Sequence, residues 1–254
     1  MEFKKINRHL IVPFLFLSVP IVTIASTHNF QIEIMGGFNH SYSPESKLYI
    51  KSDTPGVPTE VDTLHDTSSG NDFIGGAGLS YILPLADDKD DFMRDLLIGL
   101  DLYFFNTTRS GEVYLFEDPN ANNLDYDLKL KTSRLMLNGE LDFFSPWKRL
   151  APYLQGSIGV ARVEASYHDY PIGETIGGGI RLSEKTNYNF AYSLGAGVKY
   201  NFIEDFQLSI SYLYTDLGDV ETSTKSGDQV ILTQPTTDRL RTSSGLVGLS
   251  YLFG

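Results

Sequence analysis

Residues 188–202, which read YNFAYSLGAGVKYNF, carry the clearest pattern in the chain. The even-numbered positions, from Tyr188 to Phe202, are all apolar or aromatic, whereas the odd-numbered positions are polar or small. Successive side chains of a β-strand point to opposite faces, whereas a helix of 3.6 residues per turn would scatter both sets around its circumference. The segment is therefore predicted to be a strand with two unlike faces.

The same alternation recurs in other segments of the chain. They are residues 30–39, 73–83, 95–104, 134–143, 154–160, 206–214 and 245–253. Counted along the chain, long connections follow the odd-numbered strands, and short ones, such as residues 203–205, follow the even-numbered strands. This order is typical of an up-and-down antiparallel meander, with short turns at one end and long loops at the other. The sequence therefore predicts an all-β fold, an eight-stranded antiparallel barrel over residues 26–254.

The alternation changes phase in one place. Leu128 and Leu130 are even-numbered, whereas the apolar set that begins at Leu135 is odd-numbered. A β-bulge within residues 129–133 would shift the phase by one residue. A segment standing above a membrane would also break the pattern. The residues alone do not choose between these two alternatives.

Several features favour a transmembrane barrel over a soluble one. The less apolar face is mostly Gly, Ser, Asn and Ala, which suits the narrow interior of eight strands. Segments of about 10 residues at ~3.3 Å each, tilted by ~45°, span roughly the ~25 Å apolar band of such barrels. Aromatic residues also collect near strand ends, where two membrane interfaces are expected. They are Phe38, Phe73, Phe104, Phe190 and Tyr214 at the end with long loops, and Phe143, Trp147, Tyr153, Phe202 and Phe206 at the other end.

The first 25 residues are predicted to be a cleaved signal peptide. Basic residues open the chain, residues 10–24 carry no charge, and small residues follow at Ala25 and Ser26. This is the three-part layout of a secretory signal, and the apolar stretch is shorter than the ~20 residues that a membrane-spanning helix needs. We therefore expect export, with the long loops outside the cell and both mature termini in the periplasm.

The composition excludes several kinds of function. The chain has 32 acidic and 20 basic residues and a net charge of −12, so it lacks the basic footprint of a nucleic-acid binder. It contains no Cys, which excludes disulfides, Cys-ligated zinc and a thiol nucleophile. No pair of histidines has the spacing of a metal motif, so His40, His65 and His168 are expected to be solvated loop residues.

Two stretches resemble a known family. Residues 194–218, LGAGVKYNFIEDFQLSISYLYTDLG, look like the penultimate hairpin of the opacity-protein and OmpA-like eight-stranded β-barrels of Gram-negative outer membranes. Residues 151–160, APYLQGSIGV, are similar to the family's fifth strand. Tyr251 and Phe253 resemble its C-terminal assembly signal, although Gly254 follows the last aromatic residue. The resemblance implies insertion by the outer-membrane assembly machinery, contact with outer-membrane lipid and lipopolysaccharide, surface-exposed loops and no cofactor.

Charged residues on the predicted inner face form the candidate site. They are Glu33, Asp101, Arg134, Glu140, Asp142 and Lys199. Charges inside a barrel must be paired, so we expect an ion-pair network that fills the interior. Arg134 is expected to bridge Glu140 and Asp101, because a guanidinium can hold two carboxylates. A small pore is the alternative, although eight strands leave little free space.

The predicted function is that of a non-enzymatic surface barrel. Its loops would act in adhesion, host interaction or envelope integrity, through a host or surface ligand. One alternative is a rim-sited enzyme that modifies lipid A, for which His168-Asp169 near Ser166 is the nearest constellation. The other alternative is a small outer-membrane channel.

Overall fold

A computed structural model describes most of the predicted barrel. The described residues are 29–42, 46–50, 60–68, 70–85, 92–144, 149–173, 179–226, 229–230, 236–237 and 239–254. The predicted signal peptide and Trp147 lie outside these ranges. Within them, no helix is long and apolar enough to cross a membrane.

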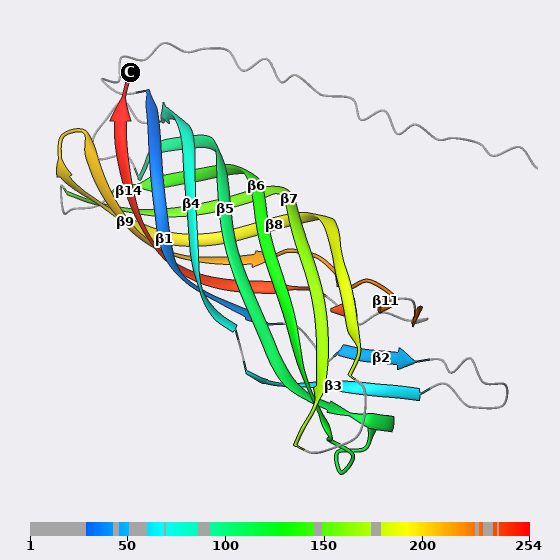
Figure 1. The fold of residues 1–254 in the computed structure, drawn as a ribbon. Helices are drawn as coiled ribbons and strands as arrows, with labels where there is room; N and C mark the ends of the chain where they lie inside the picture. Colours follow the sequence, from blue (N-terminus) through cyan, green and yellow to red (C-terminus); the bar gives the residue numbers. More distant parts are fainter. Residues whose placement is uncertain are drawn as a thin grey trace, which may run out of the picture.

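Eight strands form a closed antiparallel ring (Figure 1). In ring order they are β1 (Phe30–Tyr42), β4 (Gly70–Pro84), β5 (Met93–Tyr114), β6 (Leu124–Phe143), β7 (Leu150–Pro171), β8 (Arg181–Ile203), β9 (Phe206–Asp216) and β14 (Arg241–Phe253). The last strand pairs with the first, since Phe30 lies opposite Phe253 and Tyr42 opposite Arg241. The predicted eight-stranded up-and-down barrel is confirmed.

The two ends of the ring differ. At the turn end, Glu204 and Asp205 join β8 to β9, and the first and last strands begin and finish side by side. The loop end carries the remaining elements. They are β2 (Ser46–Ile50), β3 (Glu60–Ser68), the 3-10 turn η1 (Leu115–Glu117), β10 (Val220–Glu221), β11 (Lys225–Ser226), β12 (Gln229–Val230) and β13 (Thr236–Thr237).

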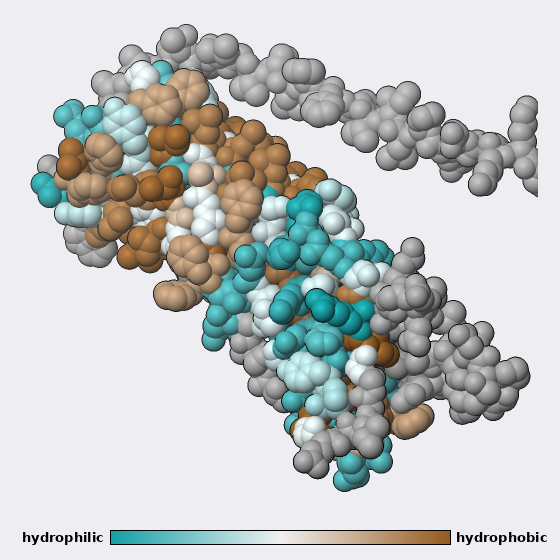
Figure 2. Space-filling model, viewed as in Figure 1, coloured by the Kyte–Doolittle hydropathy of each residue, from teal (hydrophilic) through white to brown (hydrophobic). Residues whose placement is uncertain are grey.

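A band of exposed apolar side chains surrounds the turn-end half of the barrel (Figure 2). Leu100 on β5, Leu137 on β6 and Val160 on β7 are 54%, 50% and 54% exposed. Apolar side chains that face outward in such numbers need an apolar solvent, which a bilayer core supplies. Phe38, Phe73, Phe104 and Phe190 lie exposed at its loop-end edge. Tyr153 was wrongly expected at the turn-end edge, because its odd position in β7 turns it into the barrel, where it is buried.

Four strands continue far beyond this band. β5 extends to Tyr114 instead of ending at Phe104, and β6 begins at Leu124 instead of Arg134. The predicted bounds were too short because the polarity of the two strand faces is inverted beyond the band. There the inward side chains, such as Leu128 and Leu130, are apolar and buried, and the outward ones, such as Lys129 and Lys131, are polar and exposed.

The phase change in β6 is therefore not a bulge. Its pairing with both β5 and β7 is continuous from Leu124 to Leu141, without a shift of register. Even-numbered residues point inward along the whole strand, from Tyr126 through Arg134 to Asp142. Of the two alternatives left open by the sequence, the one in which this segment stands above the membrane fits the structure.

The loop-end half encloses a hydrophobic core. Ile74, Phe105, Leu130, Met136 and Val163 are among its buried members, contributed by four neighbouring strands. Leu217, Val220 and Leu240, which lie between β9 and β14 in the chain, cover this core. The loop-end half is thus built like a water-soluble barrel, apolar inside and polar outside, on top of a membrane barrel of the opposite polarity.

One side of the loop end is much taller than the other (Figure 1). β9 ends at Asp216, which pairs with Tyr192 and Arg241, whereas β6 and β7 pair as far as Leu124 and Pro171. We call the extended parts of β5, β6, β7 and β8, residues 105–114, 124–133, 161–171 and 181–191, the tall wall. β3 widens it, because β3 pairs with β5 beyond the end of β4.

Candidate functional site

The first layer of the barrel interior, counted from the turn end, is a buried ion cluster. Lys199 on β8 donates to Glu140 and Asp142, which follow each other on the inner face of β6. The Lys199 Nζ atom lies 3.1 Å from Asp142 Oδ2 and 5.2 Å from the centre of the Tyr153 ring. All four side chains are buried, so each charge has a partner in place of the water it has lost.

The second layer holds the other two predicted carboxylates. Glu33 on β1 accepts a hydrogen bond of 2.7 Å from Ser209, and Asp101 on β5 accepts one of 3.3 Å from Tyr103. The cavity between them measures only about 10 Å³. A Cβ atom at Gly248 would collide with the Glu33 carboxylate, so the glycine makes room for it. At most about one water molecule fits here.

Arg134 forms the third layer, and its predicted partners are wrong. No ion pair joins it to Glu140 or Asp101 in the described part of the chain. Its NH1 group instead donates to Thr215 Oγ1 over 2.5 Å, and its guanidinium carbon lies 4.3 Å from the centre of the Tyr103 ring. Arg134 sits too far toward the loop end to reach Glu140, six residues away on its own strand, and Lys199 takes that place.

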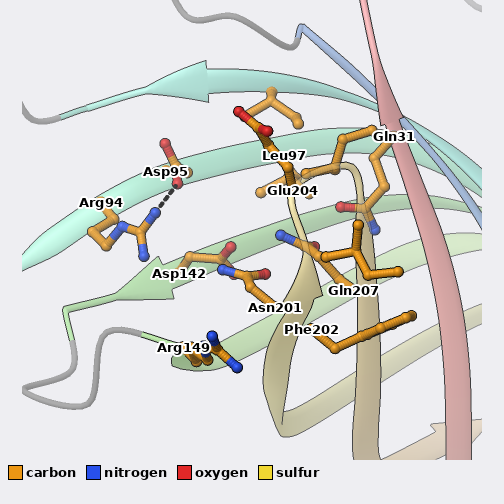
Figure 3. A pocket seen from close by; sticks show the side chains of 13 residues that line it. Gln31, Arg94, Asp95, Leu97, Asp142, Arg149, Asn201, Phe202, Glu204 and Gln207 are labelled. Carbon is orange, nitrogen blue, oxygen red and sulfur yellow. Dashed lines mark ion pairs between the residues drawn. The ribbon is translucent and has the colours of Figure 1, made fainter.

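The three layers and the apolar core above them fill the barrel from end to end. A cavity of about 420 Å³ opens at the turn end, lined by Gln31, Arg94, Asn201 and Gln207 (Figure 3). Arg94 lies 3.6 Å from Asp95 at its edge. Asp142 also lines this cavity, so it ends against the ion cluster rather than leading through the barrel. This packing does not favour the channel alternative.

The constellation expected for a lipid A-modifying enzyme is divided between two faces of β7. His168 is exposed on the outer surface, whereas Asp169 is buried inside. The Asp169 carboxylate accepts from Tyr167 over 3.0 Å and from the backbone N–H of Ile180, so it is already engaged. A catalytic triad needs the carboxylate on the imidazole. The geometry therefore does not favour this reading.

The other two histidines expected in loops lie in strands, His40 on β1 and His65 on β3, and they make local contacts. His40 Nδ1 lies 2.8 Å from Asn71 Oδ1, and the ring of His65 stacks on Tyr114 at 5.4 Å. Over the described residues, no three His, Asp or Glu side chains are grouped to hold a metal ion.

Buried polar groups fasten the strands together near the tip of the tall wall. The rings of Tyr126 and Tyr167 stack at 5.8 Å, and burial raises the pKa of Tyr126 to about 12. Burial also raises the pKa of the Asp169 carboxyl, although its hydrogen bonds from Ile180 and Tyr167 lower it in part. Asp169 thereby ties the end of β7 to Ile180, which directly precedes β8.

An exposed phenylalanine marks the tip between β5 and β6. Phe116 is 66% exposed and has a φ of 55° and a ψ of 28°, a left-handed conformation that is uncommon for an aromatic residue. The buried Asp62 carboxylate of β3 holds it there by accepting a 3.1 Å hydrogen bond from the Phe116 N–H. The neighbouring tip between β7 and β8 exposes Tyr170 and Ile172, and the Ile172 N–H donates to Asn123 over 2.8 Å.

Sequence reasoning missed this tip and the partners of Arg134. Thr215 carries no signal as a partner, because β9 is far from β6 in the chain. Tyr103 lies directly opposite Arg134 on the neighbouring strand β5, so register along that pair could have found it. The even-numbered run of Tyr126, Leu128 and Leu130 did carry a signal for the tall wall, since it continues the inward parity of β6.

The chain is similar to known outer membrane proteins. The chain is 28% identical over 196 residues to the outer membrane protein PagN of Salmonella typhimurium, covering 75% of this chain and 77% of that protein. It is 24% identical over 203 residues to RC1281 of Rickettsia conorii, which is named as a candidate adhesin, with the same two coverages. Among solved structures, Neisserial surface protein A matches 88% of this chain and 97% of its own at 14% identity and a TM-score of 0.44.

The family assignment rests on most of the barrel. The family described as the outer membrane protein beta-barrel domain matches residues 98–253, which run from β5 to the end of β14. This range contains the tall wall, the ion cluster of Lys199 and the part of the apolar band that lies on β5 to β14. The chain therefore belongs to the outer membrane protein beta-barrel domain family, and its place is the cell outer membrane.

Proposed function

We propose that this protein is a non-enzymatic adhesin. Its tall wall projects from the cell, and the tip of the wall binds the surface of a host cell. The observation that carries the proposal is Phe116, an exposed aromatic side chain held in a left-handed conformation by a buried carboxylate. Uncommon backbone conformations persist where the surrounding structure enforces them, and they cluster at functional positions. Exposed rigid aromatic residues are also frequent hot spots of protein interfaces.

Two further observations support the proposal. Tyr170 and Ile172 add exposed apolar surface beside Asn123, at a place far from the apolar band, where a membrane does not explain it. The relatives at 28% and 24% identity are an outer membrane protein and a candidate adhesin. In this proposal the loop end faces outside the cell and both ends of the barrel chain face the periplasm.

The test replaces the aromatic side chain and keeps the backbone. Asn tolerates positive φ better than other residues with a Cβ, so Phe116→Asn should fold normally. We expect it to lower the attachment of bacteria to cultured host cells several-fold. The matched control is Phe92→Asn, because Phe92 is 73% exposed but lies at the turn end. Attachment that is equal for both variants and the parent protein would refute the role of the tip.

A further inference from the structure

The cavity at the turn end of the barrel has the size and the polarity of a binding site (Figure 3). Its volume of about 420 Å³ lies within the ~300–1,000 Å³ that is usual for small-molecule sites. Asp142 of the ion cluster lies at its inner end. The cavity is therefore a blind pocket, which can hold a ligand but cannot pass one through the barrel.

Three amide side chains line this cavity with oxygen atoms that accept no hydrogen bond. Gln31 is 4% exposed and its Nε2 group donates to Ser250 over 3.1 Å, but its Oε1 atom has no donor among the described residues. The same is true of Asn201 Oδ1 and Gln207 Oε1. Buried acceptors without a donor are rare in native proteins. The last torsion of Asn and Gln is broad, so the three oxygens can turn toward a ligand that donates.

Two charged groups of opposite sign at the cavity have no ionic partner. Arg149 donates to the Tyr200 hydroxyl over 3.5 Å, and no carboxylate of the described chain lies within 4.0 Å of its guanidinium. Glu204, in the turn between β8 and β9, has no cation within that distance in the described ranges. Both side chains are exposed, so a ligand can reach them.

The remaining charges of the cavity are already paired. Arg94 lies 3.6 Å from Asp95, and Asp142 accepts from Lys199. A ligand in the cavity therefore meets one free cation, one free anion and a set of hydrogen-bond acceptors. In Figure 3 the amide side chains lie between the Glu204 carboxylate and the Arg149 guanidinium.

We propose that this cavity binds a short peptide whose two ends are free. The peptide's carboxylate pairs with Arg149, because a guanidinium fork matches a carboxylate, and its ammonium group pairs with Glu204. Its N–H groups donate to the free amide oxygens. An inorganic cation would meet two guanidinium groups in the same space, and a phosphate would meet three acceptors and a carboxylate. The cavity lies at the opposite end of the barrel from the tip, so the inference does not depend on adhesion.

The test titrates tri-alanine into the folded full-length protein in detergent micelles and measures the heat of binding. Two blocked probes, tri-alanine with a C-terminal amide and tri-alanine with an acetylated N-terminus, each lack one charge. Hydrogen bonds to charged groups are strong enough that Arg149→Gln should bind free tri-alanine about tenfold or more weakly than the parent does. The same variant should bind the C-terminal amide as the parent does, because that probe has no carboxylate. Glu204→Gln should likewise lose affinity for free tri-alanine but not for the acetylated probe.

Matched variants separate binding from folding. Arg162→Gln removes the same charge from the outer face of β7, where the side chain is 47% exposed, and should bind tri-alanine as the parent does. Gln207→Leu removes an oxygen that has no donor in the free protein, so it should weaken binding without lowering the urea midpoint. The proposal is overturned if both blocked probes bind the parent as tightly as free tri-alanine, if Arg149→Gln binds it as tightly as Arg162→Gln, or if the parent gives no heat of binding at millimolar peptide.

Two sources of such a peptide are distinguished by one more probe. Tri-alanine that ends in D-alanine, as cell-wall peptides do, is compared with the all-L form. Binding of either form supports the proposal, and the tighter one distinguishes a cell-wall peptide from a protein fragment.

Discussion

At the scale of single residues, the interior charges depend on Lys199. It is the one cation that contacts both Glu140 and Asp142 among the described residues, and all three side chains are buried. Lys199→Met leaves two carboxylates without a partner, and losing one member of a buried pair typically costs ~3–5 kcal/mol. We expect the free energy of unfolding in urea to fall by that amount.

A matched pair of variants separates this effect from general loss of charge. Lys185→Met removes a partly exposed lysine that pairs with Glu221, and such pairs contribute ~0–1 kcal/mol. The triple change Glu140→Gln, Asp142→Asn and Lys199→Met should recover most of the lost stability, because no unpaired charge remains. A triple variant as unstable as Lys199→Met would contradict the pairing argument.

Asp169 should make stability depend on pH. Burial raises the pKa of its carboxyl from the ordinary value of 3.8, so the folded chain holds the proton more tightly than the unfolded chain does. The stabilisation is complete below pH 3.8 and is lost as the pH rises through the raised pKa. The urea midpoint of the parent, measured relative to Asp169→Asn, should therefore fall from pH 4 upward and then level off. A pH-independent difference would show that the carboxyl titrates alike in both states.

At the scale of the strand, position along β5 should decide whether an outward charge is tolerated. Leu100 lies in the apolar band, and Thr108 lies eight residues further on the same outward face, above it. Arg costs ~2–4 kcal/mol at the membrane midplane and little outside it. Leu100→Arg should reduce the amount of folded protein in the outer membrane, and Thr108→Arg should not. Equal amounts of both variants in the outer membrane would contradict the placement of Leu100 inside the band and Thr108 outside it.

The strands also show where sequence reasoning stopped. Alternation in residues 134–143 located β6 correctly, because a membrane barrel separates its two faces strongly. The outer part of β6 was left open, since an apolar residue such as Leu130 points inward there while it would point outward in the band. Even-numbered residues of β6 point inward on both sides of the band's edge. The apolar residues, in contrast, point outward in the band and inward beyond it. The alternation of inward and outward positions, taken without regard to which face is apolar, would have predicted the full strand.

At the scale of the whole molecule, the direction of insertion is open to a direct test. A short epitope inserted after Gly56, which lies outside the described residues in the connection between β2 and β3, should be labelled on intact cells. The same epitope inserted between Glu204 and Asp205, in the turn between β8 and β9, should be labelled only after the outer membrane is permeabilised. Labelling of the second insertion on intact cells would place the tall wall in the periplasm.

The ring of eight strands could be predicted from the sequence, and the arrangement of its interior could not. Strand number and ring order follow from alternation and from connection lengths, which are local properties. The partner of Glu140 is Lys199, 59 positions later, and Arg134 contacts Thr215, 81 positions later. Such contacts depend on strand stagger around the ring, which no local pattern encodes. The six charges were therefore identified as interior residues but grouped incorrectly around Arg134.

The unequal height of the rim gives the molecule two directions of contact. The tip around Phe116 points away from the membrane and is suited to contacts in trans, with a different cell. The broad side of the tall wall stands upright beside the low rim formed by β9, β14 and β1, and it is suited to contacts in cis, with neighbours in the same membrane. Because the two surfaces face different directions, a contact at one leaves the other accessible.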